Sequence, residues 1–342
     1  MTTRYLQFLP LVFPALIISC NSGESAISNN LKQLPSKEES AVVKEQLKPA
    51  IDTALFLKLN KKLANGDTTG KWPAKMPIPL PGAILPFHRI VAFYGNLYST
   101  KMGILGELPK DQMIKRLLGE AQSWQRADTT LKVIPALHYI AVTAQASPGP
   151  GNKHRLRMPF SQIDKIISWS HEIKGLTFLD IQVGQSTVQE EVPVLDSFLK
   201  MPTVHLGIDP EFSMKGGHVP GKKIGTFDAA DINWVIEHLA SLVRKNNLPP
   251  KILVLHRFTQ GMLTNYQNIK KVPEVQIVVD MDGWGPKHLK RSTWLRYIYR
   301  EPVEFTGFKL FYKNDTKTGA DQFYTPKELL KFIPQPVYIQ YQ

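Results

Sequence analysis

The chain has 342 residues, and 42 lysines and arginines against 29 aspartates and glutamates give a formal net charge of +13. Hydrophobic residues make up 43% of the chain, which is enough to fill a core and excludes a disordered or collagen-like protein. The single cysteine excludes a disulfide scaffold and a cysteine-rich zinc module. The basic balance indicates an anionic neighbour and says nothing about the fold.

Residues 1–19 have the pattern of a secretory signal peptide. One charge, Arg4, precedes an apolar run at 6–18 that is too short to cross a bilayer as a helix. The run ends in Ser19-Cys20, which resembles the lipobox of bacterial lipoproteins, although a free buried cysteine is the alternative. The resemblance implies lipidation of Cys20, an anchor in a bacterial membrane, and a location in the cell envelope outside the cytoplasm. Residues 20–40, rich in serine, asparagine, glutamate and lysine, then form a flexible tether.

Residues 41–87 are expected to pack on the domain that follows. Four apolar residues spaced four apart form one helical stripe that stops at Gly66, and they are Ile51, Leu55, Leu59 and Leu63. The five prolines between Trp72 and Pro86 exclude a helix there, and we expect this segment to cross one end of the domain.

From residue 88 to residue 342, short β-branched or aromatic runs alternate with helical patterns. Eight runs predict strands at 90–94, 132–139, 176–183, 203–209, 252–258, 275–280, 307–312 and 336–340. Helices are predicted at 112–126, 160–173, 188–199, 229–244, 288–299 and 326–332, with a weaker candidate at 264–270. This alternation predicts an α/β fold, a (βα)8 TIM barrel in one domain. No helical pattern follows the eighth strand, so the helix at 51–63 is expected to replace the missing eighth helix.

Barrel enzymes carry their reacting groups at the C-terminal ends of the strands. The predicted ends form a polar ring of Tyr94, His138, Asp180, Gln182, Asp209, Glu211, His256, Asp280, Asp282 and Tyr312. Side chains two residues apart share one face of a strand, so three acidic or amide pairs are expected to point the same way.

The strongest candidate is Asp209-Pro210-Glu211, after the fourth strand. Two carboxylates about 6–7 Å apart along a strand raise the pKa of one of them, as a general acid requires. The motif resembles the Asp-x-Glu end of the fourth-strand motif in chitinase-like glycoside hydrolases, where the Glu protonates the glycosidic oxygen; Gly207 and Val204 stand where that family has earlier aspartates. The alternative is an Asx turn with a solvated Glu211.

These residues predict a hydrolase that needs no cofactor. Glu211 is the expected general acid and base, Asp209 tunes it, and Asp180 or Asp280 positions water or stabilises positive charge on a sugar. Substrate contacts are expected from the remaining polar and aromatic residues, namely Tyr94, His138, Gln182, His256, Asp282, Trp284 and Tyr312. Asp282-Gly283 also fits a turn, and either histidine could be structural.

Two other functions use the same residues. Asp180, Asp209, Asp280, His138 and His256 could together hold a divalent ion, which would make the protein a metal-dependent hydrolase. The barrel could also be a non-catalytic glycan-binding or scaffolding lipoprotein, because a fold does not fix a function.

Two loops expected at the catalytic face are strongly basic. Their cations are Lys153, His154, Arg155, Arg157, Lys215, His218, Lys222 and Lys223. Such loops attract an anionic polymer, although they could instead face the membrane surface or solvent. Nucleic acid is excluded as a partner because the chain is expected to be exported and has no binding module.

Motifs along residues 88–342 resemble an uncharacterised family of exported bacterial lipoproteins and cell-wall-associated proteins with a TIM-barrel, glycoside-hydrolase-like domain. The matching segments are 92–95, 105–107, 179–182, 207–211, 224–225, 253–258, 282–283 and 336–338. The resemblance implies a barrel at the cell envelope and brings no activity with it. The sequence therefore predicts a monomeric, membrane-anchored lipoprotein that hydrolyses a neutral or anionic glycan of the envelope or its surroundings.

Overall fold

The computed structural model describes residues 50–342. The signal peptide predicted at 1–19, the lipidation site Cys20 and the tether at 20–40 lie outside these residues and stay predictions. No helix within residues 50–342 is both long enough and apolar enough to span a bilayer.

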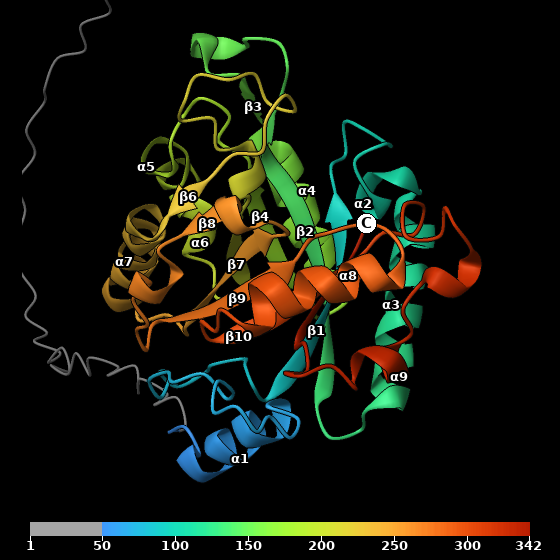
Figure 1. The fold of residues 1–342 in the computed structure, drawn as a ribbon. Helices are drawn as coiled ribbons and strands as arrows, with labels where there is room; N and C mark the ends of the chain where they lie inside the picture. Colours follow the sequence, from blue (N-terminus) through green and yellow to red (C-terminus); the bar gives the residue numbers. More distant parts are fainter. Residues whose placement is uncertain (1–49) are drawn as a thin grey trace, which may run out of the picture. The chain divides into compact units, whose positions relative to one another are not determined.

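Within residues 50–342, eight parallel strands close into a barrel (Figure 1). They are β1 (His88–Gly95), β2 (Lys132–Ala144), β4 (Leu176–Ile181), β5 (Val204–Ile208), β7 (Lys251–Arg257), β9 (Val275–Met281), β10 (Phe305–Leu310) and β11 (Tyr338–Tyr341). Each pairs with the next, and β1 closes the ring because it pairs with both β2 and β11. The predicted (βα)8 fold is confirmed.

Short strands decorate the loops. Strand β3 (Arg155–Arg157) pairs antiparallel with the extended end of β2, and β6 (Phe227–Asp228) pairs with β8 (Leu263–Thr264). Single 3-10 turns lie at η1 (Pro150–Asn152), η2 (Pro193–Leu195), η3 (Pro210–Phe212), η4 (Gln260–Met262), η5 (Tyr266–Asn268) and η7 (Ala320–Gln322).

Helices surround the strands. The longer ones are α3 (Lys110–Ala127), α4 (Phe160–Glu172), α7 (Ala229–Lys245) and α8 (Lys287–Thr293), which continues as a π-helix, η6 (Trp294–Tyr299). The shorter ones are α2 (Ile104–Glu107), α5 (Val188–Glu191), α6 (Asp196–Leu199) and α9 (Pro326–Leu329). The single helix predicted at 188–199 is wrong: Pro193 lacks an amide hydrogen, and α5, η2 and α6 replace it.

Each outer helix buries one apolar stripe against the strands. Helix α7 shows this well, because Ile232, Val235, Ile236 and Leu239 are all buried while the opposite face stays open. Asp228 and Asp231 form a capping box at the start of this helix. The Asp231 side chain accepts the backbone amide hydrogen of Asp228, and the Asp228 side chain accepts an amide hydrogen from the first helical turn. The outer ring therefore follows directly from the helical periodicity of the sequence.

Alternate residues of each strand point into the barrel and fill it in layers. The lower layers are apolar and contain Ile90, Ala92, Phe178, Val254 and Val278, all fully buried. Toward the C-terminal ends of the strands the inward positions become polar. This change from apolar to polar along one face places the candidate site.

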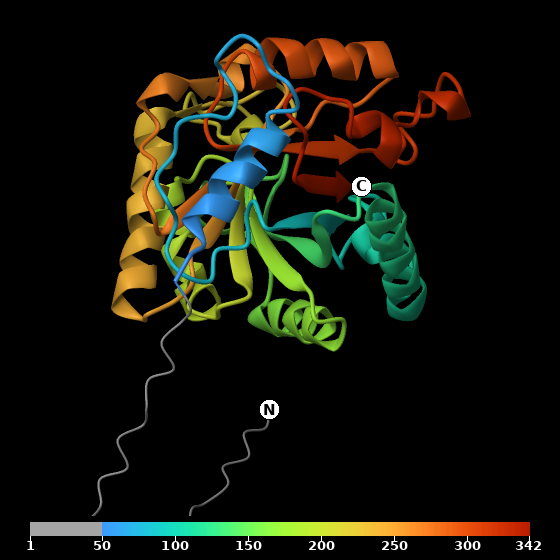
Figure 2. The same cartoon turned by 90° about the horizontal axis from the view of Figure 1, so that it is seen from below.

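Helix α1 (Thr53–Leu63) lies across the N-terminal end of the barrel, as Figure 2 shows. Its Leu63 joins the same apolar cluster as the inward residues Ile90 and Phe178. The predicted position of this helix in the outer ring, replacing an eighth helix, therefore differs from its position in the structure. The reason lies in the face that is buried: Phe56, Asn60 and Leu63 are buried, whereas Leu55 of the predicted stripe is 40% exposed.

Candidate active site

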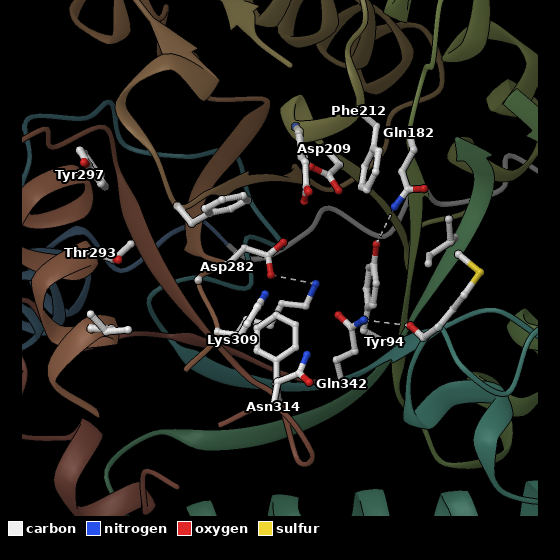
Figure 3. Close-up of a pocket in the computed structure, with 18 of the residues that line it drawn as sticks. Tyr94, Gln182, Asp209, Phe212, Asp282, Thr293, Tyr297, Lys309, Asn314 and Gln342 are labelled. Atoms are coloured by element: carbon white, nitrogen blue, oxygen red, sulfur yellow. Dashed lines mark hydrogen bonds and ion pairs between the residues drawn. The ribbon is translucent and has the colours of Figure 1, made fainter. Parts of the chain in front are cut away.

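A pocket of about 770 Å³ opens at the C-terminal ends of the barrel strands (Figure 3). Strand ends supply its floor, and α8 with the π-helix supplies one wall. The pocket is lined by Tyr94, Lys101, Met102, Ile140, Ala144, Gln182, Asp209, Glu211, Phe212, Phe258, Asp282, Gly283, Trp284, Leu289, Ser292, Thr293, Arg296, Tyr297, Lys309, Phe311, Asn314 and Gln342.

The predicted site residues divide into three groups. Six line the pocket: Tyr94, Gln182, Asp209, Glu211, Asp282 and Trp284. Four are fully buried inside the barrel and are absent from the pocket lining: His138, Asp180, His256 and Asp280. The third group is Tyr312 alone, which neither lines the pocket nor is fully buried.

Asp209 and Glu211 leave the end of β5 in a tight turn. The Oδ1 atom of Asp209 accepts the amide hydrogen of Glu211 at 3.0 Å, so the predicted Asx turn is present. Both side chains nevertheless line the pocket, and Glu211 is half-buried there. The two interpretations of this motif, a turn and a site, are therefore compatible.

The environment of these two carboxyl groups favours their neutral forms. Burial, together with the charge of Asp282, raises the pKa of Glu211 to about 7. Burial also raises the pKa of Asp209 well above its usual range, and the nearby carboxylates of Glu211 and Asp282 add to the effect. Glu211 can therefore hold a proton near neutral pH and still face the pocket.

Asp282 is a third carboxyl group of the pocket, and it is held as an ion pair. The Nζ atom of Lys309, on β10, lies 3.0 Å from Asp282 Oδ1, and Nδ1 of His256 lies 3.1 Å from Asp282 Oδ2. Burial alone would raise the pKa of Asp282, but Lys309 and His256 hold it below its usual value. Figure 3 marks the ion pair between Asp282 and Lys309 with a dashed line and shows Asp209 and Tyr94 nearby.

Beneath the pocket, Asp180 anchors a buried network. Its Oδ2 atom accepts the phenol hydrogen of Tyr94 at 2.8 Å, and its Oδ1 atom lies 3.3 Å from Nε2 of both His138 and His256. Burial opposes ionisation of Asp180, but the charge of His256 lowers its pKa below the usual range. Asp180 is thus a buried anion that supports the pocket floor.

Asp280 is buried in the same layer. Burial raises its pKa to about 7, and neither of its oxygens has a hydrogen-bond partner within residues 50–342. The prediction that Asp180 or Asp280 serves as the second catalytic carboxylate is corrected here: neither lines the pocket, whereas Asp282, two residues beyond Asp280 on the same face, does.

Tyr312 lies away from the pocket, contrary to the prediction. Strand β10 ends at Leu310, two residues earlier than predicted, so Tyr312 belongs to the following turn. Its hydroxyl donates to Glu120 of α3 at 2.8 Å, and its ring stacks on Phe323 and Tyr341. It packs α3 against the barrel.

Lys309 is the main pocket residue that the sequence reasoning missed. It is only 3% exposed, and its Nζ atom lies 3.8 Å from the centre of the Tyr94 ring as well as beside Asp282. A lysine two residues after Gly307, in a strand whose other side chains carry no charge, is the signal that could have identified it. No comparable signal existed for Arg296 or Tyr297, which reach the pocket from the π-helix.

Half of the eight cations of the two basic loops have acidic partners, and one of these is Lys153, 3.7 Å from Glu190. Arg155 and Arg157 each place Nε 2.7 Å from a carboxylate oxygen of Glu191, and Lys215 pairs with Asp231. Within residues 50–342, the cations that line the pocket itself are Lys101, Arg296 and Lys309. Because Lys309 is already paired with Asp282, attraction of an anionic polymer would depend on Lys101, Arg296 and the remaining loop cations.

No protein-family model and no curated protein matches this chain. Among solved structures, cellobiose-bound Cel5A of Thermotoga maritima is similar at 9% identity and a TM-score of 0.41, over 75% of this chain and 88% of that one. An endo-beta-N-acetylglucosaminidase from Cordyceps militaris is similar at 12% identity and 0.36, over 86% and 87%. The N-terminal domain of a putative aldolase from Bacteroides vulgatus gives 11% and 0.35, over 74% and 72%. These likenesses are too weak to bear on activity.

Proposed function

We propose that the protein is a hydrolase of glycans in which Glu211 is the general acid and Asp282 is the permanently ionised carboxylate. The observation that carries this proposal is Glu211 itself: a half-buried carboxyl group with a pKa of about 7 that opens into a 770 Å³ pocket. A carboxylic acid that keeps its proton near neutral pH is the group that protonates a leaving oxygen. Glycosidic bond cleavage needs such an acid together with a carboxylate.

Three pocket residues have defined parts in this mechanism. Glu211 donates its proton to the glycosidic oxygen as the bond to the sugar carbon breaks. A water molecule then forms the new bond to that carbon and gives up a proton to the Glu211 carboxylate, which restores the acid. Asp282, whose Oδ1 lies 3.0 Å from Lys309 Nζ, stays ionised and stabilises the positive charge that develops on the sugar ring. Asp209 holds the Glu211 amide, and so fixes the direction in which the acid points.

The lining of the pocket suits the binding of sugar rings. Aromatic side chains that line the pocket and keep some exposure are Phe258, Trp284 and Tyr297, and these can stack on sugar rings. Trp284 is 57% exposed at the pocket wall, so it is not part of the hydrophobic core. A chain could therefore enter along the open side and place one bond beside Glu211.

We further propose the location predicted from the N-terminus: lipidation at Cys20, an anchor in a bacterial membrane and a substrate in the cell envelope or its surroundings. Residues 20–40 would give the barrel reach from that membrane. Cys20→Ala should release the protein from the membrane fraction, and unchanged retention would contradict the anchor.

The activity is tested by release of reducing sugar from a panel of neutral and anionic polysaccharides. Glu211→Gln keeps the size and removes the proton, so it should lower kcat at least about 100-fold. Glu237→Gln, on the exposed side of α7, makes the same change away from the pocket and should retain wild-type rates.

Three results would count against the proposal. Equal rates for wild type and Glu211→Gln would remove Glu211 from the chemistry. Absence of release from the whole panel would also count against it. Absence of release combined with saturable binding of one polymer would instead favour the non-catalytic glycan-binding alternative.

A further inference from the structure

Three side chains meet at the centre of the barrel, directly beneath the pocket. His138 on β2, Asp180 on β4 and His256 on β7 are each completely buried, and one ligand atom from each lies within 4.8 Å of the other two. Nε2 of His138 and Nε2 of His256 both lie 3.3 Å from Oδ1 of Asp180. None of these three atoms has a hydrogen-bond partner within the part of the chain that the structure describes. Buried polar atoms without partners are costly, so this arrangement needs a cause.

A glycine keeps the space beside these atoms open. A Cβ atom on Gly207 of β5 would lie 2.4 Å from Asp180 Oδ1 and 2.5 Å from His138 Nε2. Gly207 has an ordinary strand conformation and is not among the residues with positive φ, so its backbone does not require glycine. The position that a methyl group would fill is therefore bounded by two of the three unpartnered atoms, at distances slightly longer than metal–ligand bonds of about 2.0–2.2 Å.

We propose that His138 Nε2, Asp180 Oδ1 and His256 Nε2 bind one divalent transition-metal ion. A tetrahedral ion with ligands about 2.1 Å away separates those ligands by about 3.4 Å, which matches both 3.3 Å distances. Two imidazoles and one carboxylate are donors that suit zinc or iron and disfavour calcium or magnesium. The three side chains come from the rigid barrel strands, and so the site is preorganised.

In known metal sites, outer neighbours orient the ligand side chains, and each of the three residues here has a polar neighbour of this kind. His256 Nδ1 lies 3.1 Å from Asp282 Oδ2, and Asp180 Oδ2 accepts the Tyr94 hydroxyl.

For His138, the Nδ1 atom contacts the hydroxyl of Tyr338 and the side-chain amide of Gln340. The oxygen of that amide has no partner within residues 50–342. Turning the amide over lets its oxygen accept the Nδ1 hydrogen of His138, which leaves the Nε2 lone pair free for the ion.

This site is distinct from the proposed glycan chemistry, because none of its three ligands lines the pocket. Tyr94 and Asp282 touch both places, since each lines the pocket and contacts a ligand. Metal binding therefore stands or falls without reference to Glu211.

The test uses the full-length protein. Elemental analysis after purification, followed by chelation and calorimetric titration with Zn²⁺, should give one equivalent per chain, and Co²⁺ should give the visible spectrum of a four- or five-coordinate ion. His138→Ala and Gly207→Ala should each weaken Zn²⁺ binding by at least about 100-fold. His238→Ala changes a comparable His–Asp pair on α7, in which Nε2 lies 2.7 Å from Asp196 Oδ1, and should bind as the wild type does.

Wild-type protein that binds neither Zn²⁺ nor Co²⁺ stoichiometrically would overturn the proposal, and the cluster would then be a metal-free network with a charged His256. Unchanged affinity in folded His138→Ala or Gly207→Ala would also overturn it, because the ion would lie elsewhere. Zn²⁺ should raise the wild-type melting temperature, which gives a readout even if a variant does not fold. The Glu211→Gln activity assay is independent, so failure of one proposal leaves the other standing.

Discussion

Glu211 should make the protein less stable as the pH rises, and Glu211→Gln should remove that loss. Glutamate in the unfolded chain titrates near 4.5, whereas burial and the charge of Asp282 raise the native pKa of Glu211 to about 7. Between these values the native state binds more protons, so its free energy of unfolding falls with rising pH. The contribution is fully present below pH 4.5 and is lost by about pH 7.

The magnitude follows from the two pKa values. One pKa unit corresponds to about 1.4 kcal/mol, so the full loss is about 3 kcal/mol. After allowance for the partial solvent exposure of Glu211, we expect about 2 kcal/mol between pH 5 and pH 8. Glutamine cannot ionise, and the variant should therefore become more stable than the wild type by about that amount at pH 8, relative to pH 5.

Urea denaturation curves recorded at several pH values for both proteins measure this difference without any substrate. Asp280, whose pKa is also raised to about 7, is present in both proteins, and so its effect cancels. Glu237→Gln supplies the baseline for the same chemical change on an exposed helix face. Parallel stability curves for the wild type and Glu211→Gln across this range would refute the assignment of a neutral, buried acid.

Three further substitutions separate structural from binding roles. Lys290→Met breaks a fully buried ion pair in which Nζ lies 2.8 Å from Asp315 Oδ2, and should lower the free energy of unfolding by about 3–5 kcal/mol. Lys287→Met, which breaks the half-exposed 2.7 Å pair with Glu328, should cost less than about 1 kcal/mol in the same urea assay. Trp284→Ala should leave stability within about 0.5 kcal/mol and raise KM for a polymer several-fold with little change in kcat; a lower melting temperature would show that the indole is part of the core.

The sequence was sufficient for the fold because each barrel strand is a short β-branched run between helical patterns. All eight runs, from 90–94 to 336–340, overlap observed strands. The position of α1 was not predictable in the same way, since an amphipathic stripe shows that a helix is buried but not which surface it covers. The broken helix at Pro193 shows a local chemical signal overriding a periodic one.

Depth inside the barrel decided which candidate residues reach the pocket, and depth depends on strand register. Asp280 pairs in register with Gly307 and with His256, and so it lies one layer below the mouth, where a Cβ on Gly307 would come within 2.5 Å of its Oδ1. Asp282 has the same side-chain type and faces the same way, but two residues further on it meets Lys309 and the open pocket. An error of two residues in a strand end is enough to exchange these roles, which is why the sequence pointed to both Asp280 and Asp282 without showing which of the two faces the pocket. Lys309 follows Gly307 by the same two-residue step, and the strand that makes room for Asp280 therefore also supplies the cation that keeps Asp282 ionised.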